Sequence, residues 1–256
     1  MKIYSFTIAI TLLLTSFYSV ASTQQLAWQD IDKWLSQPAS IGPWKYQKTS
    51  KNNTVLHSLV NTSNTFGGGV LLYRETNKPC FISIPHQFHD KYTLTIGRAL
   101  FDAHCNMLVH NTHHRHSESP DSHPMDYSKR ASGIHVAAVQ AFHNKYPNGL
   151  IFQLHGFNQK KRKTPQAKKA DFILSQGRSY NAKLAKLQSC LMTLSQNTYI
   201  YQKDVFELGG TKNVLHKVGL APHRFIHIEI SKPMRKRLKS HPVSMEQFNL
   251  CLSYSA

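Results

Sequence analysis

The stretch Leu150-Ile151-Phe152-Gln153-Leu154 is an apolar run that ends in His155-Gly156-Phe157. A short run of large apolar residues followed by a glycine is typical of a strand buried on both faces, as in parallel sheets. Similar runs recur far away in the sequence, at residues 80–85, 107–109 and 225–230. The sequence therefore predicts a sheet whose central strands are buried.

Segments with helical spacing separate these runs. Apolar residues recur at helical intervals over residues 93–104 and again over 133–146. Further helices are expected at 28–35, 179–193, 211–218 and from 234 onward, further strands within 39–64, at 70–74 and within 199–206, and loops at 110–132 and 157–170. Strands that alternate with helices indicate a three-layer α/β/α fold with a mostly parallel mixed sheet.

The N-terminus has the pattern of a secretory signal peptide. Lys2 is the only charged residue among the first 29, an apolar core spans residues 8–14, and Ser19-Val20-Ala21 is a small-x-small cleavage signal. An uncleaved membrane anchor is disfavoured because this core is too short to span a bilayer. We therefore expect residues 1–21 to be a signal peptide and residues 22–256 to form one exported domain, periplasmic or secreted, with no membrane span.

The cysteines fit an exported protein. Cys80, Cys105, Cys190 and Cys251 make an even number, and none lies in a CxxC motif. An oxidising compartment favours two disulfides over free thiols. Cys80 and Cys105 lie at the starts of predicted strands and can bridge them, which leaves Cys190 to pair with Cys251. The spacing alone leaves other pairings open.

The chain is strongly basic. Lys and Arg outnumber Asp and Glu by 31 to 13, which gives a formal charge of +18. The basic residues concentrate at 160–163, 168–169 and 232–239. An exported basic protein is expected to meet acidic substrates or cell-envelope polymers rather than to bind nucleic acid specifically. The alternative is a solvated basic surface with no partner.

Metal-ligand side chains follow two of the predicted strands. His86 and Asp90 come after the strand at 80–85, and His155 ends the run quoted above. The carboxyl ends of parallel strands meet at one crevice, so we expect these side chains to lie together and to bind zinc. His89 is an alternative second ligand, and His155 could instead be a core histidine bonded to the backbone.

Glu229 lies inside the apolar run at 225–230. With a period of two residues, His227 and Glu229 share one face of the strand. A carboxylate in a buried strand needs a partner, which is either an Arg or Lys in an ion pair or a water from which Glu229 takes a proton as general base. The same alternation puts Gln153 on the face of His155, where it can orient the site.

Three motifs resemble the zinc-dependent amidohydrolases related to N-formylglutamate amidohydrolase and poly-γ-glutamate hydrolase, a group with a zinc carboxypeptidase-like fold. These motifs are Pro-His-Gln-Phe-His-Asp-Lys-Tyr-Thr at 85–93, Gln-Leu-His-Gly-Phe at 153–157, and Ile-Glu-Ile-Ser at 228–231 with Arg235. The resemblance implies zinc ligands at His86, Asp90 and His155 and a general base at Glu229. It favours Asp90 over His89 because the acid-to-threonine spacing up to Thr93 matches the poly-γ-glutamate enzymes.

Arg115 closes the segment Asn111-Thr112-His113-His114-Arg115. The resemblance implies that it binds the substrate carboxylate or the polarised carbonyl, a task that suits the forked guanidinium. A surface arginine is the alternative. The histidines between His104 and His123 could bind metal or simply be solvated.

These observations predict an exported hydrolase with Zn²⁺ as its cofactor. It would cleave an amide or peptide bond next to a carboxylate, with Glu229 as the general base and Arg115 on an anionic group. The expected substrate is a small anionic amide or an acidic polymer. The alternative is a non-catalytic periplasmic protein that binds metal or polyanions through its His-rich loop and basic surface.

Overall fold

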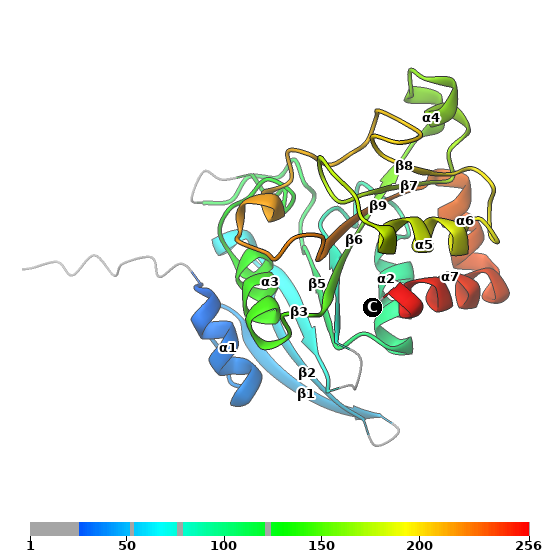
Figure 1. The fold of residues 1–256 in the computed structure, drawn as a ribbon. Coiled ribbons are helices and arrows are strands. Elements are labelled where there is room, and N and C mark those ends of the chain that lie inside the picture. The colour runs from blue at the N-terminus through cyan, green and yellow to red at the C-terminus, as the bar shows by residue number, and fades with distance from the viewer. Residues whose placement is uncertain (1–25, 52–53, 76–78, 121–123, 256) are drawn as a thin grey trace, which may run out of the picture.

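A computed structural model describes residues 26–255 except 52–53, 76–78 and 121–123. Figure 1 shows a twisted sheet with helices on both of its faces. The expected signal peptide, residues 1–21, lies outside the described residues.

The described residues form a nine-stranded mixed sheet with the strand order β1-β2-β3-β5-β4-β6-β9-β7-β8. Its strands are β1 (Lys45–Lys51), β2 (Thr54–Asn61), β3 (Gly69–Tyr73), β4 (Cys80–Ile84), β5 (Met107–His110), β6 (Leu150–Phe157), β7 (Phe172–Ser175), β8 (Thr198–Ile200) and β9 (Phe225–Ser231). The central strands β5, β4, β6 and β9 run parallel, as do β7 and β8. The other four pairings are antiparallel, so the expected mixed α/β sheet is confirmed but only its centre is continuously parallel.

Helices cover both faces of the sheet (Figure 1). On one face, α1 (Trp28–Ser36) and α3 (Ile134–Lys145) bury side chains such as Trp34 and Phe142. The opposite face is covered by α2 (Thr93–Ala103), α5 (Ala182–Leu191), α6 (Lys232–Ser240) and α7 (Pro242–Ser255). The expected three-layer α/β/α architecture is confirmed. None of the helices in the described part of the chain is long and apolar enough to cross a membrane.

The alternation of side chains along β6 and β9 determines which of them point to each face of the sheet. Leu154 and Ile228 belong to the core beneath α2, α5, α6 and α7. His155 and Glu229 follow them directly and therefore point to the other face. Because β6 and β9 are parallel, His155 is paired in register with Glu229. The sheet thus brings the two residues side by side.

Both expected disulfides are present. Cys80, at the start of β4, is bonded to Cys105, which lies just before β5. Cys190 of α5 is bonded to Cys251 of α7. The first bridge joins two neighbouring strand starts, and the second ties together two helices on the same face of the sheet.

Some elements were not expected from the sequence. β7 is only four residues long, and polar and apolar residues do not separate onto two faces of α7, so neither gives a clear periodic signal. The segment 157–170, expected as a loop, contains a 3₁₀ turn η2 (Gln159–Lys161) and the short helix α4 (Pro165–Lys169). A further 3₁₀ turn is η1 (Thr65–Gly67), while η3 (Val214–Lys217) lies within the segment 211–218 where a helix was expected.

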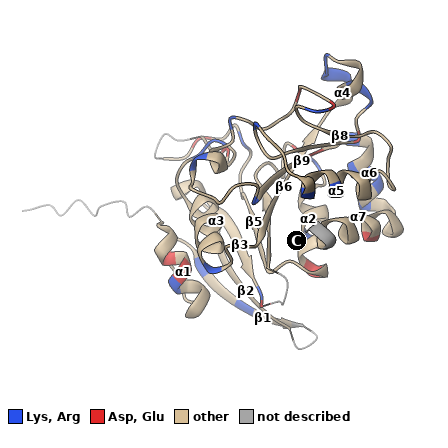
Figure 2. Ribbon diagram, viewed as in Figure 1, with Lys and Arg blue, Asp and Glu red and all other residues tan. Residues whose placement is uncertain are grey.

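The predicted basic cluster at 160–163 and 168–169 surrounds α4. Figure 2 shows its Lys and Arg residues on an arm that projects from the rest of the fold beyond the end of β6. Lys160, Lys161 and Lys168 are exposed. The arm is therefore a solvated basic surface, and a partner for it stays a prediction.

Candidate metal centre

The turn after β4 separates the side chains of Asp90 and His89. The carbonyl oxygen of His86 accepts hydrogen bonds from the amides of His89 at 3.0 Å and Asp90 at 2.7 Å. This turn buries His86 and Asp90, which are 2% and 3% exposed, and leaves His89 at the surface. Asp90, not His89, therefore shares the interior with His86.

His86, Asp90 and His155 converge on one point. The Nδ1 atoms of His86 and His155 each lie 3.5 Å from Oδ2 of Asp90. Ligand atoms around a tetrahedral zinc ion are about 3.4 Å apart, given metal–ligand distances of about 2.1 Å. The three side chains are therefore spaced as a set of ligands to a single metal ion, although they come from two distant segments.

The remaining ring nitrogens of both histidines are held by acceptors. Nε2 of His86 donates to Oδ1 of Asp126 at 2.6 Å, and Nε2 of His155 donates to Oε1 of Gln153 at 2.8 Å. Gln153 is fixed in turn, because its amide donates to Oγ of Ser83 at 3.1 Å. A proton on Nε2 leaves the Nδ1 lone pair free on each ring, which is the arrangement that metal-binding histidines commonly show. The residues present therefore fit a zinc ion.

Asp126 is a site residue that the sequence analysis missed. Besides binding His86, it accepts a bond from Nη2 of Arg115 at 2.6 Å and is held by the Ser128 amide at 3.0 Å. Its neighbours Met125 and Tyr127 are buried although the surrounding segment is polar. An acid between two large apolar residues in a polar loop was the only signal that could have identified it.

Glu229 lies beside this cluster and is 8% exposed. Its Oε1 is 3.3 Å from Nε2 of His227, whose ring packs on that of His155 at 4.5 Å between centroids. Its Oε2 has no hydrogen-bond partner among the described residues. The buried Arg235 donates instead to the carbonyl oxygens of Lys91 and Ile230. Within the described chain, no Lys or Arg therefore forms the ion pair that was the alternative role for Glu229.

A cavity of about 350 Å³ opens onto the cluster. Its lining includes His86, His155, Glu229, Arg115, Lys129 and Lys212. Arg115 is held by Asp126, while its Nη1 lies 3.4 Å from Nδ1 of His86. Glu229 is the only carboxylate among the described lining residues, so the cavity has a positive wall suited to an anionic ligand.

Burial and hydrogen bonding shift the titration of the cluster. Burial alone would raise the pKa of Asp90, but the neighbouring imidazoles of His155 and His86 hold that pKa well below its usual range. Burial and the neighbouring His227 lower the pKa of His155 to about 4. Burial would also lower the pKa of His86, but Asp126 and Asp90 raise it above 6.5. At neutral pH the cluster therefore combines a carboxylate with at least one neutral imidazole.

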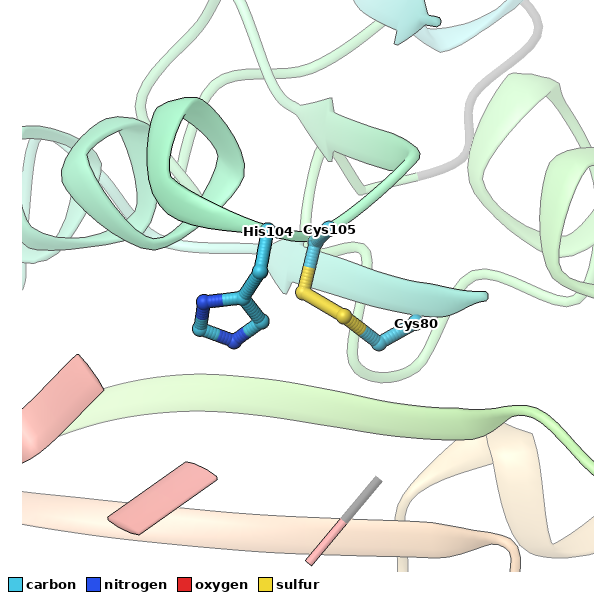
Figure 3. Close-up of side chains that lie close together, drawn as sticks. All are labelled: Cys80, His104 and Cys105. Carbon is cyan, nitrogen blue, oxygen red and sulfur yellow. A yellow bond between two sulfur atoms is a disulfide. The ribbon is translucent and has the colours of Figure 1, made fainter. Parts of the chain in front are cut away.

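A second group of metal-ligand residue types is already committed to another bond. Figure 3 shows the imidazole of His104 beside Cys80 and Cys105. The two sulfur atoms are bonded to each other as a disulfide. No thiolate of this group is therefore available for a metal ion.

No family model matches the sequence, and no curated protein matches it either. Among solved structures, the chain resembles the N-formylglutamate amidohydrolase from Ralstonia eutropha JMP134, with a TM-score of 0.50 and 12% identity over 73% of this chain and 96% of that one. It also aligns with a zinc-free apo form of YNDL, with a TM-score of 0.45 and 16% identity over 73% of this chain and 88% of that one. A bacteriophage poly-γ-glutamate hydrolase aligns with a TM-score of 0.43 and 10% identity over 87% of this chain and 93% of that one. The first likeness confirms the predicted α/β fold.

Proposed function

We propose that this protein is an exported zinc-dependent hydrolase that cleaves an amide or peptide bond next to a carboxylate. The supporting observation is the convergence of two histidine Nδ1 atoms on one carboxylate oxygen, each at 3.5 Å, with both Nε2 atoms held by acceptors. The shared fold with an amidohydrolase agrees with this proposal. His86, Asp90 and His155 would hold the zinc ion. When bound, zinc would supply Lewis acidity toward a carbonyl group and toward a water molecule.

Glu229 would move the proton in this reaction. Its Oε2 is free of hydrogen-bond partners among the described residues, and Glu229 lines a cavity that His86 and His155 also line. A carboxylate placed in this way can accept a proton from a water molecule and donate it to the leaving amine. His227 would position the carboxylate through the contact at Oε1.

Arg115 would bind the anionic part of the substrate, supported by Lys129 and Lys212 across the cavity. The Arg115 side chain is 22% exposed, and its Nη2 binds Asp126, so the guanidinium has donor capacity left for a substrate. The proposed substrates are a small anionic amide or an acidic polymer. Their carboxylates would pair with this wall of cations.

The proposal includes export and a single domain. Residues 1–21 would be removed as a signal peptide, and residues 22–256 would form the mature protein. The two disulfides support this proposal because such bonds persist in oxidising compartments.

The substitution Glu229→Gln tests the proposed chemistry. The variant keeps the size of the side chain but removes the proton acceptor, so hydrolysis of an acidic amide substrate should fall by about 10²–10⁴-fold. Zinc content, measured by metal analysis, and the melting temperature should stay close to those of the unaltered protein. Activity is first located by screening the zinc-loaded protein against γ-glutamyl, N-acyl amino acid and peptide substrates.

Glu246→Gln is the matched control, because Glu246 is exposed on α7 and its substitution changes the net charge by the same amount. It should leave hydrolysis unchanged. If Glu229→Gln keeps full activity but lowers the melting temperature, Glu229 is a structural residue and the proposed role is wrong.

A further inference from the structure

We infer that His89, His114 and His116 form a second metal site at the protein surface, suited to a borderline divalent ion such as Zn²⁺ or Cu²⁺. The His89 ring centroid lies 5.7 Å from that of His114 and 5.9 Å from that of His116. The centroids of His114 and His116 are 5.2 Å apart. The three imidazoles thus form a triangle with nearly equal sides.

This triangle is close to the size that a shared metal ion requires, and the rings must turn to bring their nitrogens within 4.8 Å of one another. The centre of an imidazole ring bound to zinc lies about 3.2 Å from the ion, because the zinc–nitrogen bond is about 2.0–2.1 Å long. Two such rings then have centroids about 5.2 Å apart at the tetrahedral angle and about 5.5 Å apart at 120°. The three observed separations lie at or just above these values. Imidazole nitrogen suits Zn²⁺, Ni²⁺ and Cu²⁺, which defines the class of ligand.

The backbone of both segments that carry the triangle is anchored. His89 lies on the turn that buries His86 and Asp90, and its amide donates to the His86 carbonyl oxygen at 3.0 Å. His114 begins a turn in which its carbonyl oxygen accepts from the Ser117 amide at 2.9 Å. Arg115 holds this second segment to the interior through Asp126. The histidines therefore meet through fixed backbone, not through a chance contact of free side chains.

The rings are in a state that can bind a metal. Nδ1 of His114 accepts a long hydrogen bond of 3.3 Å from the His116 amide, and a metal ion bound at this nitrogen would replace that bond. His89 and His116 are exposed, and their rings can turn to aim a nitrogen at a common ion.

This site is distinct from the candidate metal centre. His86, Asp90 and His155 are buried, whereas His89, His114 and His116 lie at or near the surface on the outer side of the same two segments. The inference does not depend on the proposed hydrolase activity. A protein without any catalytic function could still contain both metal sites.

Zinc titration of the full-length mature protein, without an affinity tag and stripped by a chelator, tests the inference. Equilibrium dialysis should show two equivalents of Zn²⁺, one tight and one weaker. Each of the substitutions His89→Asn, His114→Asn and His116→Asn should weaken the second equivalent by at least tenfold, since it removes one of three ligands. The triple variant should lose this equivalent and keep the tight one.

Electron paramagnetic resonance of Cu²⁺ added to the zinc-loaded protein should show nitrogen hyperfine structure that the triple variant lacks.

His113→Asn is the matched control, because His113 lies in the same segment but its ring contacts the Thr112 hydroxyl, at 3.1 Å from Nδ1, and not the three histidines of the triangle. It should leave both equivalents unchanged. The inference is overturned if the unaltered protein binds one equivalent only, or if the triple variant retains the second. Equal weakening by His113→Asn would also overturn it, because that result indicates diffuse binding to histidines. Melting curves of the variants, expected to be unaltered, exclude unfolding as the cause.

Discussion

The two halves of the candidate metal centre are built in different ways. His155 and Glu229 lie on adjacent strands, and Glu229 is paired on both sides, with His155 of β6 and Ile173 of β7. His86 and Arg115 lie in loops, which Asp126 ties together by binding both side chains. In the strand half, His155 and Glu229, backbone pairing positions each residue independently of its side-chain contacts. In the loop half, His86 and Arg115, the positions depend on the carboxylate of Asp126. The following substitutions and titration test this difference.

His155→Asn should have the largest effect. It removes a proposed metal ligand from the strand half, so zinc affinity should fall by more than 100-fold, beyond the 10–100-fold cost of losing an outer partner. The sheet should persist because backbone pairing does not require the imidazole. Equilibrium dialysis measures the affinity, and far-ultraviolet circular dichroism of the zinc-free protein checks the fold. His241→Asn, at an exposed histidine, is the control, and an unchanged affinity for His155→Asn would exclude this residue as a ligand.

Asp126→Asn should have an intermediate effect confined to the loop half. The amide oxygen can still accept from His86, but the ion pair with Arg115 is lost, so zinc affinity should fall by about 10–100-fold. Substrate binding through Arg115 should weaken in parallel, seen as a raised KM. Asp102→Asn, at an exposed position on α2, removes the same charge as a control. If Asp126→Asn behaves like this control, the loop half does not depend on Asp126.

The smallest effect concerns the titration of the zinc-free protein. Burial and His227 lower the pKa of His155 to about 4, whereas Asp126 and Asp90, against the effect of burial, raise the pKa of His86 above 6.5. His155 thus contributes stability above pH 6.5 that is lost as pH falls through about 4. His86 contributes stability below pH 6.5 that is lost as pH rises through its folded pKa. Nuclear magnetic resonance titration of the imidazole signals measures both values, and two pKa values on the same side of 6.5 would contradict the comparison.

Much of the strand half could be predicted from the sequence, because its signals are local. The apolar run before His155 predicts a buried strand, and alternation within β9 puts His227 and Glu229 on one face. The α/β pattern predicts parallel strands, but only the tertiary structure shows that β6 and β9 are neighbours and brings His155 beside Glu229. The prediction that one sheet edge gathers these residues agrees with the geometry, while their chemical roles stay predictions.

The loop half could not be predicted in the same way. Asp126 lies in a polar segment without periodicity, and its contacts with His86 and Arg115 span 40 and 11 residues of sequence. The motif around His89 and Asp90 left two possible ligands, and only the path of the turn shows that Asp90 faces inward. The meeting of His89 with His114 and His116 depends on the same two loops.

The sequence by itself determined the buried strands, the alternation on them and the class of fold, because burial and side-chain period are properties of consecutive residues. Its cysteine positions favoured the two disulfides that are present, because Cys80 and Cys105 lie at strand starts, but the spacing left other pairings open and the tertiary structure decided between them. Only the tertiary structure decided which acid joins His86, which carboxylate holds Arg115 and where the outer histidines meet. Those contacts depend on the paths of irregular loops, which are set by packing between distant segments and leave no local pattern in the sequence.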